Sequence, residues 1–115
     1  MARKLEETTI ALYRQANKYA EARGLILADA RLEFGLLNGK LILIDEMLTP
    51  DSSLYWEAAA WKPGRTPDDF AKQHVLDYLE GLDWDQREPG PALPFNLVAK
   101  TREKYISALK RITGI

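Results

Sequence analysis

Acidic side chains suited to binding a divalent cation gather in the first half of the sequence, with one arginine among them. They are Asp29, Arg31, Glu33, Asp45, Glu46 and Asp51. Carboxylates that project from neighbouring strands offer the oxygen ligands that Mg²⁺ takes in a near-octahedral shell, and Mg²⁺ can bridge from them to nucleotide phosphates. The same pattern is also typical of a solvated strand face with cross-strand ion pairs. The spacing alone leaves both interpretations open.

A β-hairpin is the element that must position these side chains. Apolar and polar residues alternate over residues 25–35, which predicts a strand that carries Asp29, Arg31 and Glu33 on one face. Asn38-Gly39 supplies the two residues of positive φ that a tight turn needs, and residues 40–46 form the predicted returning strand.

The length of the turn decides which acid faces Arg31. With a two-residue Asn38-Gly39 loop, Glu46 faces Arg31 and Asp45 lies on the apolar side of the ribbon. A three-residue loop that begins at Leu37, with a left-handed glycine in a bulge, instead puts Asp45 opposite Arg31. In both registers an acid is expected to face Arg31.

Helices are predicted before and after this hairpin. Small and apolar residues recur every three or four positions in the first and last segments, and a glycine follows each of them. The predicted elements are a helix over 4–23, the hairpin, an irregular ordered loop over 49–65, a helix capped by Thr66 with Pro67 in its first turn, a connector over 81–94 and a helix over 94–113. We therefore predict an α+β fold, an antiparallel hairpin packed with about three helices, in a single domain over residues 1–115.

Composition excludes several classes of function. The chain has 115 residues, 46% of them hydrophobic, which suffices for one core. Its 16 basic and 17 acidic residues give a net charge of -1 without a basic cluster, so a nucleic-acid partner is not expected. No cysteine is present, which excludes disulfides and thiolate chemistry. No segment has the pattern of a signal peptide or a membrane span, so we expect a soluble cytoplasmic protein without a membrane partner.

Four stretches of the chain resemble the SAICAR synthetase family. Residues 27–35 (LADARLEFG) are similar to the family signature, in which an apolar pair is followed by Asp, any residue, Lys, an apolar residue and Glu-Phe-Gly. Residues 43–53 (LIDEMLTPDSS) resemble the family's next block, and 70–80 resembles the block after that. The tail over 101–114 fits the closing helix. The similarity covers nearly the whole chain and implies the fold of the family's C-terminal lobe.

This resemblance implies a reaction and a set of site residues. In the family, ATP drives amide formation between the carboxylate of an aminoimidazole ribonucleotide and the amine of aspartate, with Mg²⁺ assisting. ATP and Mg²⁺ are therefore the implied cofactors and a nucleotide the implied substrate, while the residues that would hold ATP are not assigned. The resemblance assigns Glu33 and Asp45 to the metal, Asp29 and Arg31 to the catalytic strand, and Asp51, Ser52 and Ser53 to substrate binding. The metal assignment requires the bulged register.

Two positions depart from the family pattern. The signature lysine is Arg31 here, and a planar guanidinium does not replace a compact ammonium. Position 54 is Leu54, where the family usually has an arginine that meets the substrate phosphate. Loss of that cation removes a charge-assisted contact of roughly 1.5–3 kcal/mol.

The family's N-terminal nucleotide lobe has no counterpart in this sequence. A subunit of a split enzyme, a truncated homologue with a new role and a fragment would each explain this. The first explanation predicts a ligase that needs an N-terminal-lobe subunit in trans and is inactive alone. The second predicts a non-catalytic binding or oligomerisation module, in which a homo-oligomer or another partner covers the face that the lobe would occupy.

Several other residues have weaker functional patterns. His74 could serve as a base, but an isolated histidine on a helix flank fits the sequence better. Trp56, Trp61 and Trp84 are interpreted as packing anchors of loops.

Overall fold

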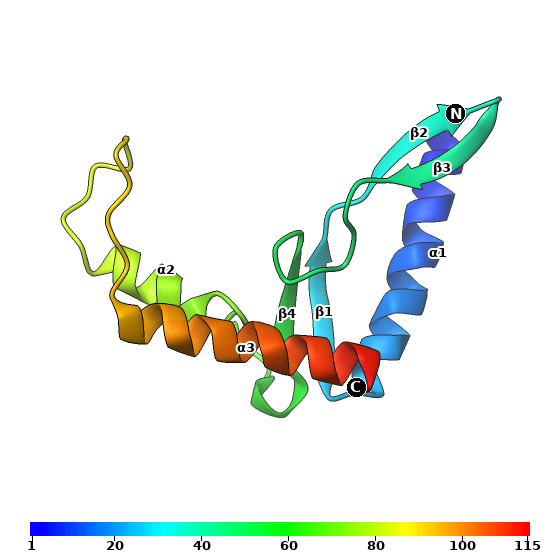
Figure 1. Ribbon diagram of the computed structural model, residues 1–115. Coiled ribbons are helices and arrows are strands. Elements are labelled where there is room, and N and C mark those ends of the chain that lie inside the picture. Colours follow the sequence, from blue (N-terminus) through cyan, green and yellow to red (C-terminus); the bar gives the residue numbers. More distant parts are fainter. The chain divides into compact units, whose positions relative to one another are not determined.

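The computed structural model describes residues 1–115, which form two compact units, Met1–Pro67 and Asp68–Ile115 (Figure 1). The first unit contains α1 (Ala2–Glu21), β1 (Leu25–Ala30), β2 (Glu33–Leu37), β3 (Lys40–Ile44), β4 (Ser53–Glu57) and the 3-10 helix η1 (Ala58–Ala60). The second contains α2 (Gln73–Glu80) and α3 (Phe95–Thr113). Three α-helices with antiparallel strand pairs confirm the α+β prediction, whereas the single-domain assignment stays a prediction. No helix is both long enough and apolar enough to cross a bilayer.

The core of the first unit lies where α1 packs on β1. Leu25 and Leu27 are completely buried, as is nearly all of Ala20 on the helix. Two side chains of α1 satisfy the main chain of Leu27: the Asn17 Oδ1 atom accepts its N–H at 2.9 Å, and the Tyr13 hydroxyl donates to its carbonyl oxygen at 2.5 Å. Buried main-chain groups need hydrogen-bond partners, and at this position of β1 the side chains of α1 supply them in place of a neighbouring strand.

The predicted long strand over 25–35 is wrong, because it divides into β1 and β2 at Arg31 and Leu32. β1 pairs antiparallel with β4, and β2 pairs antiparallel with β3, as two separate two-stranded sheets (Figure 1). The prediction of an irregular loop over 49–65 is also wrong, because β4 lies within these residues. In this strand Tyr55 is buried and Trp56 is half-buried. Packing of these side chains stabilises the extended backbone, and turn residues nearby in the sequence do not reveal that packing.

The β2–β3 hairpin has the two-residue turn, so the prediction of the bulged register is also wrong. Leu37 pairs with Lys40 and Glu33 pairs with Ile44. Asn38 and Gly39 between them have φ of 51° and 76°, the left-handed values of a type I′ turn. The twist of such a turn matches that of the flanking strands, which favours it over a longer loop.

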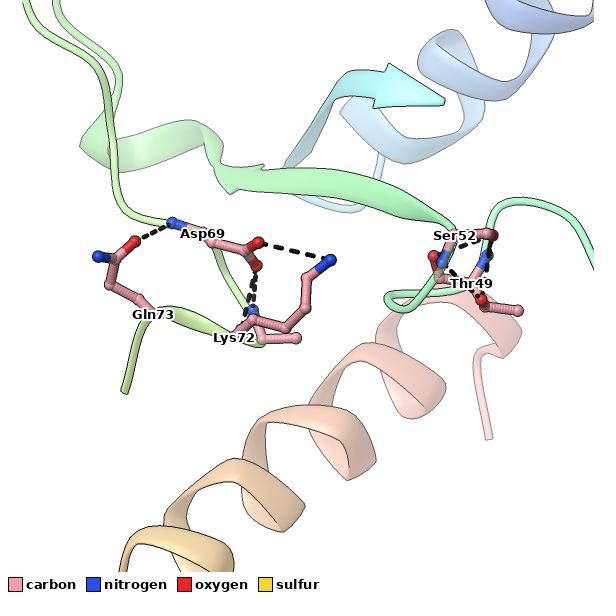
Figure 2. A network of polar contacts seen from close by, with 6 residues as sticks. Thr49, Ser52, Asp69, Lys72 and Gln73 are labelled. Atoms are coloured by element: carbon pink, nitrogen blue, oxygen red, sulfur yellow. Dashed lines mark hydrogen bonds and ion pairs between the residues drawn. The ribbon is translucent and has the colours of Figure 1, made fainter. Parts of the chain in front are cut away.

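In the second unit, α2 begins at Gln73 and not near Thr66 as predicted. A network around Asp69 precedes the helix (Figure 2). The Asp69 Oδ1 atom accepts the N–H groups of Ala71 and Lys72 at 3.0 and 3.1 Å, and Gln73 Oε1 accepts the N–H of Asp69 at 2.8 Å. Reciprocal bonding of this kind satisfies N–H groups of the turn that leads into α2, so Asp69 and not Thr66 is the side chain that bonds the main chain before this helix.

The last helix runs close to its predicted bounds and packs on α2. Gly114 ends it with φ of 74°, as a left-handed C-terminal glycine. Phe70 is buried in this unit, and the Lys104 Nζ and Arg111 Cζ atoms lie 4.9 and 5.3 Å from its ring centroid. Cations at this distance from an aromatic ring stabilise its position.

Candidate functional site

Asp29 lies at an irregularity in the β1–β4 pair. Leu27 pairs with Tyr55 and Asp29 pairs with Leu54, so Ala28 is the extra residue of a β-bulge. In an unbroken strand Asp29 would share the face of the two buried leucines of β1, because side chains two residues apart lie on one face. A bulge re-aims the side chains that follow it, and the Asp29 residue is exposed.

Arg31 occupies the short link between β1 and β2. Its N–H donates to the Ser52 carbonyl oxygen at 3.3 Å, and its Nη2 atom lies 3.5 Å from Glu33 Oε1. The acid beside Arg31 is thus a neighbour on the same stretch of chain, and the predicted cross-strand pairing with Asp45 or Glu46 is wrong. The two side chains are 74% and 44% exposed, so the ion pair contributes at most about 1 kcal/mol.

Glu33 and Asp45 lie at the open end of the β2–β3 hairpin. Glu33 is paired with Ile44, and Asp45 follows Ile44 directly. Asp45 has φ of 62°, where the chain leaves the strand. Aspartate tolerates this left-handed conformation better than most residues do. Glu33 and Asp45 are therefore close along the backbone of the hairpin, but the bulged register on which their assignment to one metal depended is not the one observed.

Thr49 and Ser52 hold a compact turn over 49–52 (Figure 2), and Asp51 lies within this turn. The N–H of Thr49 donates to Ser52 Oγ and the N–H of Ser52 donates to Thr49 Oγ1, both at 3.2 Å, while the two hydroxyl oxygens lie 3.1 Å apart. Asp51 is exposed. The Ser52 hydroxyl thus helps to shape the turn, and the Asp51 carboxylate within it faces solvent.

Ser53, the first residue of β4, is only 5% exposed and pairs with Ala30. Its Oγ atom has no hydrogen-bond partner. A buried hydroxyl without a partner is costly in free energy, about 1–3 kcal/mol. The hydroxyl of Ser53, one of the three residues predicted to bind substrate, therefore has an unused donor and an unused acceptor.

Sequence reasoning missed Tyr55, whose hydroxyl bonds the main chain of Leu48 just before this turn. Tyr55 is 6% exposed, and its hydroxyl donates to the carbonyl oxygen of Leu48 at 2.6 Å. Leu48 has φ of 61°, a conformation that leucine rarely adopts. Burial raises the pKa of the Tyr55 phenol above its usual 10.0. In a strand, side chains alternate between the two faces, so recognising residues 53–57 as a strand would have predicted that Ser53 and Tyr55 lie on the same face.

We expect the Tyr55→Phe variant to lose about 1 kcal/mol of unfolding free energy at neutral pH, since one net hydrogen bond disappears. Because the folded-state pKa is raised, the parent keeps this stabilisation in full below pH 10 and loses it as the pH rises toward the folded-state value. The deficit of the variant should therefore shrink above pH 10. Urea titrations of both proteins from pH 7 to 11 measure the difference in unfolding free energy. A difference that stays constant with pH would show that ionisation of Tyr55 is not linked to unfolding.

The donor set of the hairpin fits part of a Mg²⁺ site. Mg²⁺ is commonly held by one or two carboxylates, with water and phosphate oxygens completing its shell, and Glu33 and Asp45 provide two. No group of three or more acidic or histidine side chains is placed to hold a metal ion. His74 lies in α2 of the second unit and is half-buried. What the hairpin offers is two carboxylates near its open end, Glu33 and Asp45.

The chain is similar to known proteins over nearly its whole length. Residues 1–91 match the SAICAR synthetase family. The phosphoribosylaminoimidazole-succinocarboxamide synthases of Geobacter metallireducens and Thioalkalivibrio sulfidiphilus are 49% and 54% identical to it over 99% of the chain. A solved structure of SAICAR synthase from Saccharomyces cerevisiae, complexed with SAICAR, is 37% identical, covers 98% of the chain and has a TM-score of 0.91.

The chain spans 38% of the Geobacter protein, 39% of the Thioalkalivibrio protein and 38% of the yeast chain. The match therefore includes almost every residue of this chain but only one portion of each longer relative. Identities near one half over such coverage establish common ancestry and fold. The chain belongs to the SAICAR synthetase family.

Proposed function

We propose that this chain supplies part of the catalytic site of an ATP- and Mg²⁺-dependent ligase that joins an aminoimidazole carboxylate ribonucleotide to aspartate in purine biosynthesis. The remaining part of the site comes from the portion of the family fold that this sequence does not span. The observation that carries the proposal is the identity of 54% over 99% of the chain to a phosphoribosylaminoimidazole-succinocarboxamide synthase. The SAICAR complex of the yeast relative supports the nucleotide class of substrate.

Each proposed role rests on a placement in the first unit. Glu33 and Asp45, adjacent at the end of the hairpin, would hold Mg²⁺, and Arg31 at 3.5 Å from Glu33 orients that carboxylate. When bound, Mg²⁺ would neutralise charge on the phosphoryl group that activates the substrate carboxylate. Asp29 beside the bulge and Asp51 in the turn present exposed carboxylates to a substrate.

Activity of a reconstituted protein tests the proposal. We would co-express the chain with the portion of the Thioalkalivibrio sulfidiphilus protein that the chain does not match. ADP release would then be followed with the aminoimidazole carboxylate ribonucleotide, aspartate and Mg²⁺. We expect ADP release that requires both polypeptides and both substrates. A stable complex without activity would contradict the proposed function.

Within an active complex, we expect Glu33→Gln to lower kcat/KM at least about 100-fold, because even the outer partners of metal ligands matter 10- to 100-fold. Part of the loss should be recovered at high Mg²⁺ concentration, since the amide still offers one oxygen. Glu46→Gln is the matched control, because Glu46 is also exposed just beyond β3 and has no assigned role. Equal rates for the two variants across a Mg²⁺ titration would remove Glu33 from the metal site.

A second candidate function is a non-catalytic binding module, and the position of Leu54 favours it. Leu54 pairs directly with Asp29 across β1 and β4. The arginine expected at this position would therefore lie next to a proposed catalytic carboxylate, and leucine provides no charge there. An inactive complex that becomes active on Leu54→Arg combined with Arg31→Lys would favour the module, whereas activity of the unaltered chain would exclude it.

A further inference from the structure

The connection from β3 to β4 carries two of the carboxylates that are proposed to act in the site (Figure 1). It runs over residues 45–52, with Asp45 at its start and Asp51 next to its end. Leu48 lies midway, three residues from each of them. Because each residue has two soft main-chain dihedral angles, the conformation of Leu48 sets how the two carboxylates lie relative to each other.

Leu48 has an unfavourable backbone conformation. Its φ is 61°, and that of Asp45 is 62°, so both residues are left-handed. Aspartate is enriched among residues of this conformation, whereas leucine is not, because its Cβ crowds the neighbouring carbonyl oxygen. A residue in such a conformation persists only where the surrounding structure compensates for the steric cost. Some contact must therefore hold Leu48 in place.

The hydroxyl of Tyr55 provides that contact, since it donates to the carbonyl oxygen of Leu48 at 2.6 Å. Tyr55 is 6% exposed and pairs across β1 and β4 with the completely buried Leu27, so its ring is anchored in the core of the unit. Residues 45–47 make no hydrogen bond, whereas the turn over 49–52 is closed by its own side chains. Tyr55 is thus the side chain that ties the middle of the connection to the core.

We propose that Tyr55 is a positioning residue of the site: through Leu48 it fixes the β3–β4 connection and with it the arrangement of Asp45 and Asp51. The inference rests on the proposed function. Without the hydroxyl, the connection has to be ordered when the metal ion binds, which weakens that binding. The rate at saturating Mg²⁺ should change little, because the connection is then ordered in both proteins.

The Mg²⁺ dependence of ADP release tests the inference in the complex with the unmatched portion of the Thioalkalivibrio sulfidiphilus protein. We expect Tyr55→Phe to raise the Mg²⁺ concentration for half-maximal rate about fivefold, the effect of one net hydrogen bond, and to change kcat less than about twofold. Tyr13→Phe is the matched control, because it also removes a tyrosine hydroxyl that donates to a main-chain carbonyl, that of Leu27 at 2.5 Å. It should leave the Mg²⁺ dependence within about twofold.

The order of the connection is measured without reference to activity, by nuclear magnetic resonance relaxation of the free chain. We expect backbone order parameters of residues 45–48 near about 0.85 in the parent and in Tyr13→Phe, and below about 0.6 in Tyr55→Phe. Leu48→Asn added to Tyr55→Phe should reverse at least half of the change in order parameter and in Mg²⁺ requirement. Asparagine adopts the left-handed conformation more readily than leucine and so depends less on the tyrosine hydroxyl.

The possible results separate this inference from the proposed function. An active complex in which Tyr55→Phe leaves the Mg²⁺ requirement unchanged, or in which Tyr13→Phe raises it equally, overturns the positioning role and leaves the ligase proposal intact. Unchanged order parameters at residues 45–48 also overturn it. A parent complex without ADP release overturns the proposed function, and the order parameters then decide whether Tyr55 holds the connection. A variant that circular dichroism shows to be partly unfolded is compared with the others in sucrose, which favours folded states.

Discussion

Replacement of Leu27 by alanine is expected to lower the unfolding free energy by about 2–5 kcal/mol. Leu27 is completely buried in β1, the strand on which α1 packs, so the shorter side chain leaves a cavity as well as losing apolar burial. Its main-chain bonds to Asn17 and Tyr13 do not depend on its side chain, which confines the effect to packing. Urea denaturation followed by circular dichroism and tryptophan fluorescence measures the change.

Leu36→Ala is the control for this variant, because it removes the same atoms from a side chain that is 58% exposed. We expect it to cost below about 1 kcal/mol, since little buried apolar area disappears. If Leu27→Ala were no more destabilising than Leu36→Ala, the packing of α1 on β1 would not be the core of the unit. β1 carries Asp29 two residues further on, so loss of this packing should also destabilise the end of the strand that holds Asp29.

Replacement of Asp69 by alanine is expected to cost about 1–3 kcal/mol and to reduce the helicity of α2. The substitution leaves the N–H groups of Ala71 and Lys72 without their acceptor. Ala71 is 2% exposed, so water cannot easily replace the carboxylate there. Far-ultraviolet circular dichroism across a thermal transition reports both the stability and the helical content.

Two further variants separate the hydrogen bonds of Asp69 from its charge. Asp69→Asn keeps an acceptor oxygen but removes the ion pair with Lys72, whose Nζ atom lies 3.7 Å from Asp69 Oδ2. Lys72→Met removes the same pair from the other side. The Lys72 side chain is 33% exposed and that of Asp69 only 8%, so we expect each change to destabilise the protein, but less than Asp69→Ala, which also removes both hydrogen bonds. An Asp69→Asn variant as unstable as Asp69→Ala would show that charge, and not capping geometry, stabilises this turn.

Local chemistry accounts for the features that the sequence predicted correctly. Asn38-Gly39 encodes its own turn because both residues tolerate positive φ, and their values of 51° and 76° agree with that. Gly114 ends α3 for the same reason. The motif around residues 27–35 identified the family, which the similarity to known relatives confirmed. Each of these inferences depends on residues close together in the chain.

The misjudged features depend on partners far away in the chain. Nothing in residues 25–35 marks the break at Arg31, because no proline interrupts the alternation there. The break arises because β1 finds its partner in β4, more than twenty residues later, while β2 pairs with the strand next to it. Likewise, the bulge that re-aims Asp29 exists only as a mismatch between two strands.

The sequence by itself therefore determined the family, the class of fold, the turn residues and the identity of the acidic side chains. Only the tertiary structure decided how those acids are arranged: Glu33 beside Arg31, Asp45 at the end of β3, and Asp29 opposite Leu54. The physical reason is that side-chain type and short-range periodicity are local properties, whereas strand pairing, register and burial are settled by which distant segments pack together.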